Sequence, residues 1–75
     1  MIFQESVPRL DWAMPQNNLG NALKNQGIRI GGEQGKTLLA EAVTAFESAL
    51  IVFKASQMNW HVRIVEKNID FIHFL

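Results

Sequence analysis

The feature that most constrains the fold is the spacing of apolar residues, which recur at intervals of three and four along three stretches of the chain. In the longest stretch, residues 36–54, they form one broad stripe, and polar side chains such as Glu41 and Glu47 lie mostly off it. This spacing is typical of an amphipathic helix with one buried face. Shorter stretches at 11–27 and 59–75 show the same periodicity. The sequence therefore predicts an all-α fold.

Turn-forming and polar residues divide what we expect to be a single domain, residues 1–75. Asp11 and Asn59 are suitable N-caps, and Gly27 is a suitable stop. Pro15 is tolerated only in a first turn, so the first helix is expected to begin close to it or to bend there. The expected parts are an N-terminal tail at 1–10, a first helix at 11–27, a glycine-rich loop at 28–35, a second helix at 36–55 and a closing helix at 59–75. Together they make an antiparallel helical hairpin plus a closing third helix.

Each expected helix has its own apolar stripe, and the third has two. The core stripes are Trp12, Leu19, Ala22 and Leu23 in the first helix; Leu38, Leu39, Ala42, Val43, Phe46, Ala49, Leu50 and Phe53 in the second; and Val62, Val65, Ile69 and Ile72 in the third. A surplus row in the third helix consists of Ile64, Phe71, Phe74 and Leu75. One hairpin cannot cover both faces of the closing helix, and exposed apolar surface of this kind marks an association site. We therefore expect this row to be the interface of a homo-oligomer, in the simplest case a dimer.

Composition excludes several ways of stabilising so short a chain. The 75 residues contain no cysteine, and the two histidines, His61 and His73, do not make a closed zinc site. Seven basic residues balance seven acidic ones, so no basic face for nucleic acid is expected. Neither a signal peptide nor a membrane-spanning run is apparent. These features favour a soluble, cytoplasmic, bacterial-type protein with no metal, cofactor, nucleic-acid or membrane partner.

Two stretches resemble a tetratricopeptide repeat. Leu19, Gly20 and Leu23 occupy the positions of the family's first-helix motif, and the second-helix motif is matched by Ala42, Phe46 and Ala49. These six positions are the expected helix-packing residues: Gly20 and Ala42 allow the helices to touch, and larger side chains fill the space beside the contact. The closing helix resembles a degenerate first helix, so the chain corresponds to about one and a half repeats.

The resemblance also has departures. Gln16 stands where the family has tryptophan, and Asp70 replaces glycine in the closing helix. Between Gly27 and Glu41 there are 13 residues, where the standard 34-residue repeat has about three. The pattern is therefore closer to the long-repeat variants of bacterial tetratricopeptide proteins, with a longer loop between the helices.

The resemblance implies a non-catalytic protein-interaction module whose first helix lines a groove for a peptide. The matching exposed positions are Asn17, Asn21, Lys24 and Asn25. Asparagine can donate to and accept from a peptide backbone, and lysine can attract a carboxylate. Asn18 is expected to bridge neighbouring helices. The alternative for the polar positions is a solubilising face.

Two other functions compete with peptide binding. The chain could be a small self-assembling structural protein, or a fragment of a longer repeat array with no ligand of its own. A weaker hypothesis is an enzyme that uses Gly31–Thr37 as a phosphate loop, but the spacing before Gly-Lys-Thr is one residue too short and no buried strand precedes it.

Overall fold

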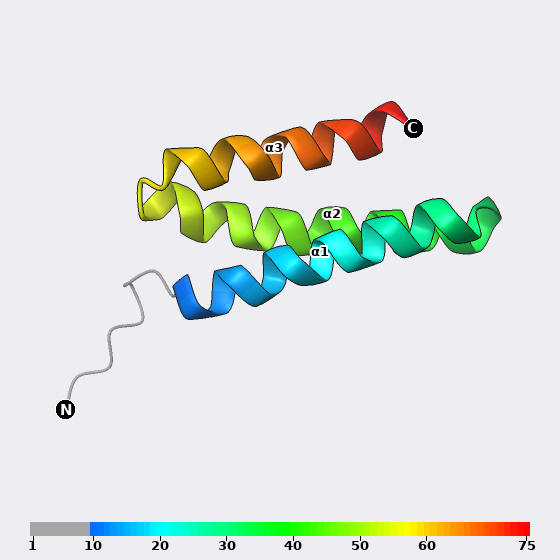
Figure 1. The fold of residues 1–75 in the computed structure, drawn as a ribbon, viewed down its shortest axis with the longest axis horizontal. Coiled ribbons are helices and arrows are strands. Elements are labelled where there is room, and N and C mark those ends of the chain that lie inside the picture. The colour runs from blue at the N-terminus through cyan, green and yellow to red at the C-terminus, as the bar shows by residue number, and fades with distance from the viewer. Residues whose placement is uncertain (1–9) are drawn as a thin grey trace.

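A computed structural model describes residues 10–75 and confirms the all-α prediction, with a helical hairpin closed by a third helix (Figure 1). The helices are α1 (Leu10–Ile30), α2 (Gly32–Ala55) and α3 (Asn59–Phe74). α1 and α3 run in the same direction, and α2 runs antiparallel to both (Figure 1). The expected tail at 1–10 lies outside the described residues except for Leu10, which is already helical.

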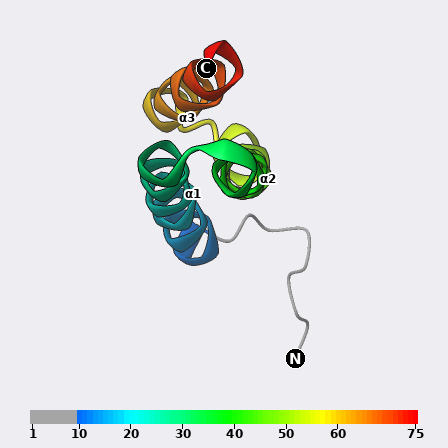
Figure 2. The same ribbon diagram turned by 90° about the vertical axis from the view of Figure 1, so that its right-hand side faces the viewer.

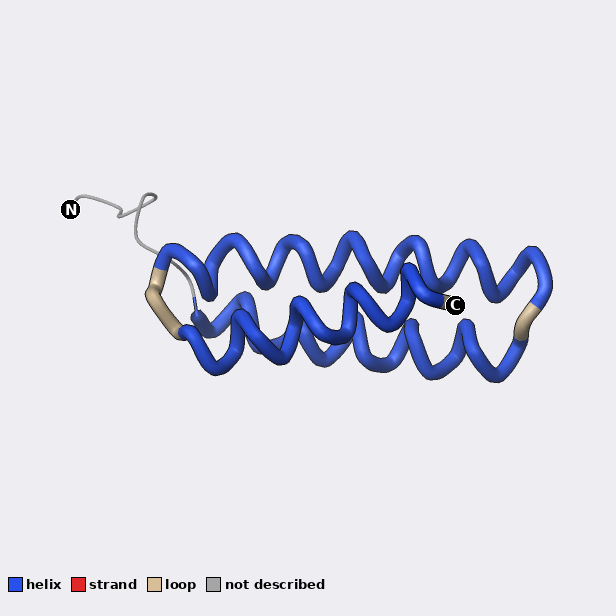
Figure 3. Tube along the Cα trace, turned by 90° about the horizontal axis from the view of Figure 1, so that it is seen from above, coloured by secondary structure: helices blue, strands red, loops and turns tan. Residues whose placement is uncertain are grey.

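Seen from the end, α3 lies above the junction between α1 and α2, and α1 slopes away from α3 towards its own N-terminus (Figure 2). Most of the contact that holds α3 is therefore with α2. Short connections at opposite ends of the molecule join the helices (Figure 3).

The prediction of a glycine-rich loop at 28–35 is wrong, because these residues are helical except for Gly31. α1 continues past Gly27 to Ile30, and the chain reverses where Gly31 and Gly32 have φ angles of 69° and 63°. Glycine adopts these left-handed angles without the steric cost that other residues incur. The second helix consequently begins at Gly32, four residues before the predicted start.

Small residues at intervals of seven form the seam between α1 and α2. Ala13, Gly20 and Gly27 recur along α1; Gly35, Ala42 and Ala49 recur along α2; and all six are buried. A Cβ atom at Gly35 would lie 2.5 Å from the carbonyl oxygen of Gly27, so the two backbones touch there. Gly27 thus serves close approach of the helices, and the glycines with positive φ that reverse the chain are Gly31 and Gly32. Small side chains at a helix crossing permit this short separation.

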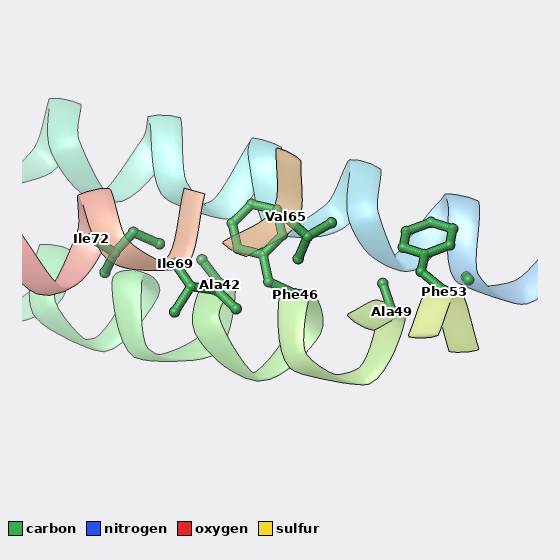
Figure 4. Close-up of a cluster of buried hydrophobic side chains, with 8 residues drawn as sticks. Ala42, Phe46, Ala49, Phe53, Val65, Ile69 and Ile72 are labelled. Atoms are coloured by element: carbon green, nitrogen blue, oxygen red, sulfur yellow. The ribbon is translucent and has the colours of Figure 1, made fainter. Parts of the chain in front are cut away.

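Phe46 and Phe53 of α2 fill the space beside this seam and are fully buried. In Figure 4 the Phe46 ring points from α2 towards α1, and a Cβ atom at Gly20 would lie 2.7 Å from two of its carbons. Burying each phenylalanine contributes about 2 to 3 kcal/mol relative to exposure. The remaining core members come from α3: Val65, Ile69 and Ile72 (Figure 4).

The apolar stripe predicted for the first helix is wrong. Trp12, Leu19 and Ala22 are exposed, and only Leu23 is partly buried. Leu19 is 47% exposed, so this expected packing residue lies on the outer surface. The reason is that α1 packs through its smallest side chains, which rotates its larger apolar residues away from α2.

The start and end of the helices also differ from prediction in detail. Asp11 and Pro15 lie inside α1, which continues through the proline. The N-cap of α3 is Met58, with no side-chain hydrogen bond, so Asn59 is the first helical residue instead of the cap. Leu75 follows the end of α3 at Phe74.

Candidate interaction surface

The predicted peptide-binding residues of α1 lie in two settings. Asn17, Asn21 and Lys24 are partly buried, whereas Asn25 is exposed. Spacings of four and three place Asn17, Asn21 and Lys24 on one face of the helix. This face is therefore less open than the sequence indicates, and it is partly covered by the rest of the fold.

Lys24 links α1 to α3. Its Nζ atom donates a hydrogen bond of 3.1 Å to Oδ1 of Asn68 and lies 5.7 Å from the centroid of the Phe71 ring. An ammonium group at this distance from an aromatic ring makes a favourable cation–π interaction. The structure thus brings together Lys24 from the expected peptide site and Phe71 from the expected oligomer interface.

Lys24 and Asn68 bridge the helices, the role that the resemblance implies for Asn18. Asn18 is exposed and lies off this face. Asn68 was not singled out from the sequence. Asn68 could have been found from its position, because it is a polar residue between Ile64 and Phe71 on the same side of α3. A polar residue that is partly buried at such a position needs a hydrogen-bond partner.

Asn17 has a different environment. Its Oδ1 atom is buried and has no hydrogen-bond partner among the described residues. A ligand cannot reach this oxygen without some movement of the neighbouring side chains. Of the predicted polar set, Asn21, Lys24 and Asn25 are the residues with polar groups near the surface.

The surplus apolar row of α3 is exposed, as a free interface requires. Phe74 is 91% exposed, Leu75 is 64% exposed, and Ile64 and Phe71 are each more than one-third exposed. Trp60 precedes Ile64 by one turn and is also largely exposed, so it extends the row beyond the predicted members. Spacings of four and seven put Trp60, Ile64 and Phe71 on one side of the helix.

The far end of this surface lies beside the turn between α1 and α2. Ile28 and Leu75 line the same shallow hollow of about 240 Å³, together with Gly31. Apolar side chains therefore flank Lys24 from Phe71 to Ile28. We call the surface formed by Asn21, Lys24, Asn25, Ile28, Ile64, Phe71 and Leu75 the α1–α3 face.

Charged groups elsewhere form exposed pairs. Lys54 on α2 lies 3.7 Å from Glu66 on α3, and both side chains are about half exposed. Lys36 lies 3.9 Å from Glu33 within α2. Glu41 and Glu47 are both exposed on α2. Exposed pairs of this kind contribute little to stability, so they mark the solvent side of the helices.

The segment Gly31–Thr37, considered above as a phosphate loop, is almost entirely the first turns of α2. The hydroxyl of Thr37 donates a hydrogen bond of 3.2 Å to the carbonyl oxygen of Glu33. Between residues 10 and 75 no strand precedes this segment. Its geometry is that of an ordinary helix start after a glycine turn.

The two histidines lie in different environments. His61 stacks at a tilt against Phe53, with ring centroids 4.9 Å apart, and His73 is exposed near the end of α3. Across the described residues, histidine and acidic side chains form no group of three that could hold a metal ion. No helix of this part of the chain combines the length and the apolar character that a membrane span requires.

Comparison of the chain with known protein families, with characterised proteins and with solved structures finds no match. The resemblance to tetratricopeptide repeats thus stays a prediction.

Proposed function

We propose that this chain is a non-catalytic protein-interaction module of tetratricopeptide type, and that its α1–α3 face binds a segment of another protein. The observation that supports this proposal is the contact of Lys24 with both Asn68 and Phe71. It joins polar α1 and apolar α3 residues in one surface, and a peptide needs both kinds of contact to bind with specificity.

The chemistry of the face suggests how a peptide would be held. Lysine has three N–H donors, so Lys24 keeps two for a peptide carboxylate while it bonds to Asn68. Asn21 and Asn25 can pair with backbone groups of an extended chain, and Phe71, Ile28 and Leu75 offer apolar contacts. A bacterial origin and a cytoplasmic location belong to the same proposal.

A random peptide library displayed on phage tests this function. Peptides with acidic and apolar residues should be enriched on the parent protein, and Lys24→Met should raise the Kd of a selected peptide about tenfold, the loss expected for one charge-assisted contact. Gln26→Ala is the matched control, because Gln26 is exposed on the opposite side of α1. If no peptide is enriched, or if both variants bind equally well, the proposal is wrong.

Self-assembly is the second candidate function, and the exposed row of α3 favours it. Phe74, Leu75 and Trp60 present a large apolar area to solvent, and a second copy is one partner that could cover it. Sedimentation should then show dimers whose association weakens when Ile64 or Phe71 is replaced by a polar residue. A monomer at high micromolar concentration would exclude this alternative.

A further inference from the structure

The turn between α2 and α3 has an unusual residue at its central position. The N–H of Gln57 donates to the carbonyl oxygen of Lys54 at 3.0 Å, and the N–H of Met58 donates to that of Phe53 at 2.9 Å. This pair of bonds defines a Schellman motif, which requires a left-handed residue and usually has glycine there. Here the residue is Gln57, with a φ of 59°, the only non-glycine residue with positive φ among residues 10–75. The turn therefore carries backbone strain.

The same sequence suits an uninterrupted helix. Residues 56–59 are Ser, Gln, Met and Asn, with neither glycine nor proline, and glutamine and methionine are good helix formers. At the start of α3, the N-cap Met58 makes no side-chain capping bond. Straightening the chain at Gln57 would join α2 and α3 into one helix and remove the strain.

Defined side-chain pairs along the whole length of α3 hold it on the α1–α2 hairpin. His61 packs on Phe53, Glu66 pairs with Lys54, and Asn68 accepts from Lys24. Between these contacts Val65, Ile69 and Ile72 are buried in the core. Each of these contacts joins α3 to α1 or α2, so each forms equally well when α3 comes from another copy of the chain.

We propose that α3 is exchanged between two copies, so that the α3 helix of each copy docks on the α1–α2 hairpin of the other. No native α3 contact is lost in the exchange, and two strained turns are relaxed per dimer. The Lys24 site is then built from two chains, because the second copy supplies Asn68 and Phe71. This inference does not depend on peptide binding.

The matched pair Gln57→Gly and Gln57→Ala tests the exchange, because the two variants differ by one methyl group. Glycine relieves the strain of the turn and disfavours the straight helix, whereas alanine keeps the strain and favours the helix. With two turns per dimer, and with strain and helix propensity both acting at each turn, the association constant from sedimentation should be about a thousandfold larger for Gln57→Ala than for Gln57→Gly. Equal association constants, or monomers alone in both variants at high micromolar concentration, would overturn the proposal.

Cross-linking identifies the arrangement within the dimer. The chain has no cysteine, and Lys54 and Glu66 form an exposed pair whose loss has little effect on folding. A tagged Lys54→Cys chain mixed and refolded with an untagged Glu66→Cys chain should be joined to it by a short bismaleimide. The double variant Lys54→Cys/Glu66→Cys is the control, since its monomer is cross-linked within one chain.

A different dimer is distinguishable from exchange. If association is unchanged by Gln57→Gly but abolished by Ile64→Asp, and the mixed single-cysteine chains are not joined, the copies associate through the exposed row of α3. That result would refute helix exchange and leave the peptide-binding proposal untouched.

Discussion

Replacing Gly20 with leucine perturbs a close contact between α1 and the Phe46 ring of α2. A Cβ atom at this position would lie 2.7 Å from Cδ1 and Cε1 of Phe46, about 1 Å closer than the normal separation of two carbon atoms. Phe46 is fully buried, so its ring cannot move into solvent to make room. The helices must therefore separate, or the ring must leave its preferred rotamer.

The expected loss is about 2 kcal/mol in the free energy of unfolding. Overpacking of a core costs about 1 to 3 kcal/mol, and leucine belongs in the upper part of this range because it adds three further carbon atoms beyond Cβ. Its better helix propensity returns less than about 1 kcal/mol. The least stable domains unfold with a free energy of about 5 kcal/mol, so the change is large enough to shift the whole transition.

Urea denaturation followed by far-ultraviolet circular dichroism measures this loss. Ala22→Leu is the control, because Ala22 is exposed on the same helix and its substitution should change stability by less than about 0.5 kcal/mol. In a Phe46→Ala background, the cost of Gly20→Leu should fall by at least about 1 kcal/mol, since the colliding ring is absent. Coincident unfolding curves for Gly20→Leu and the parent would refute the packing argument.

Three further changes test separate parts of the structure. Gly35→Ala should cost about 2 to 3 kcal/mol, because its Cβ would lie 2.5 Å from the Gly27 carbonyl oxygen; a neutral result in urea denaturation would show that the helices are not in backbone contact. Gly31→Ala should cost about 1 to 3 kcal/mol through backbone strain alone, because φ 69° with ψ −173° lies in a region adopted almost only by glycine and a Cβ there meets no atom within 4 Å; Gly31→Asn should cost about as much in the same assay, because asparagine is tolerated only in the left-handed helical region. Adding ATP and magnesium should leave amide hydrogen exchange at Gly31–Thr37 unchanged, because the Thr37 hydroxyl is bonded within α2; slower exchange would revive the phosphate-loop hypothesis.

The buried faces of α2 and α3 could be predicted from the sequence because large apolar residues define them. Phe46, Phe53 and Val65 have the spacing of a core stripe and are the largest fully buried side chains. The face of α1 could not be found in this way, because hydrophobic periodicity gives weight to Trp12 and Leu19, whereas the helix packs through alanine and glycine. The signal in the sequence that marks the correct face is the seven-residue recurrence of small residues, Ala13, Gly20 and Gly27, which our prediction did not use.

The candidate site was predictable only in part. The polar α1 positions and the surplus row of α3 are visible as sequence patterns, but their junction at Lys24 depends on how α3 lies across the hairpin. Within one chain that placement requires the left-handed turn at Gln57, a conformation that the residue itself does not favour. Tertiary packing selects it, so local sequence preferences could not reveal it.

The seam between α1 and α2 makes the hairpin a palindrome of small residues centred on Gly31. Gly27 and Gly35 each lie four positions from this centre, Gly20 and Ala42 lie eleven, and Ala13 and Ala49 lie eighteen. A single inserted or deleted residue in one arm would displace every outer pair and turn the mismatched helix by about 100°. The helices of the hairpin can therefore differ in length beyond Ala13 and Ala49, or both can gain or lose whole heptads together. The number of residues between Gly31 and each small residue is otherwise fixed by the geometry of the seam.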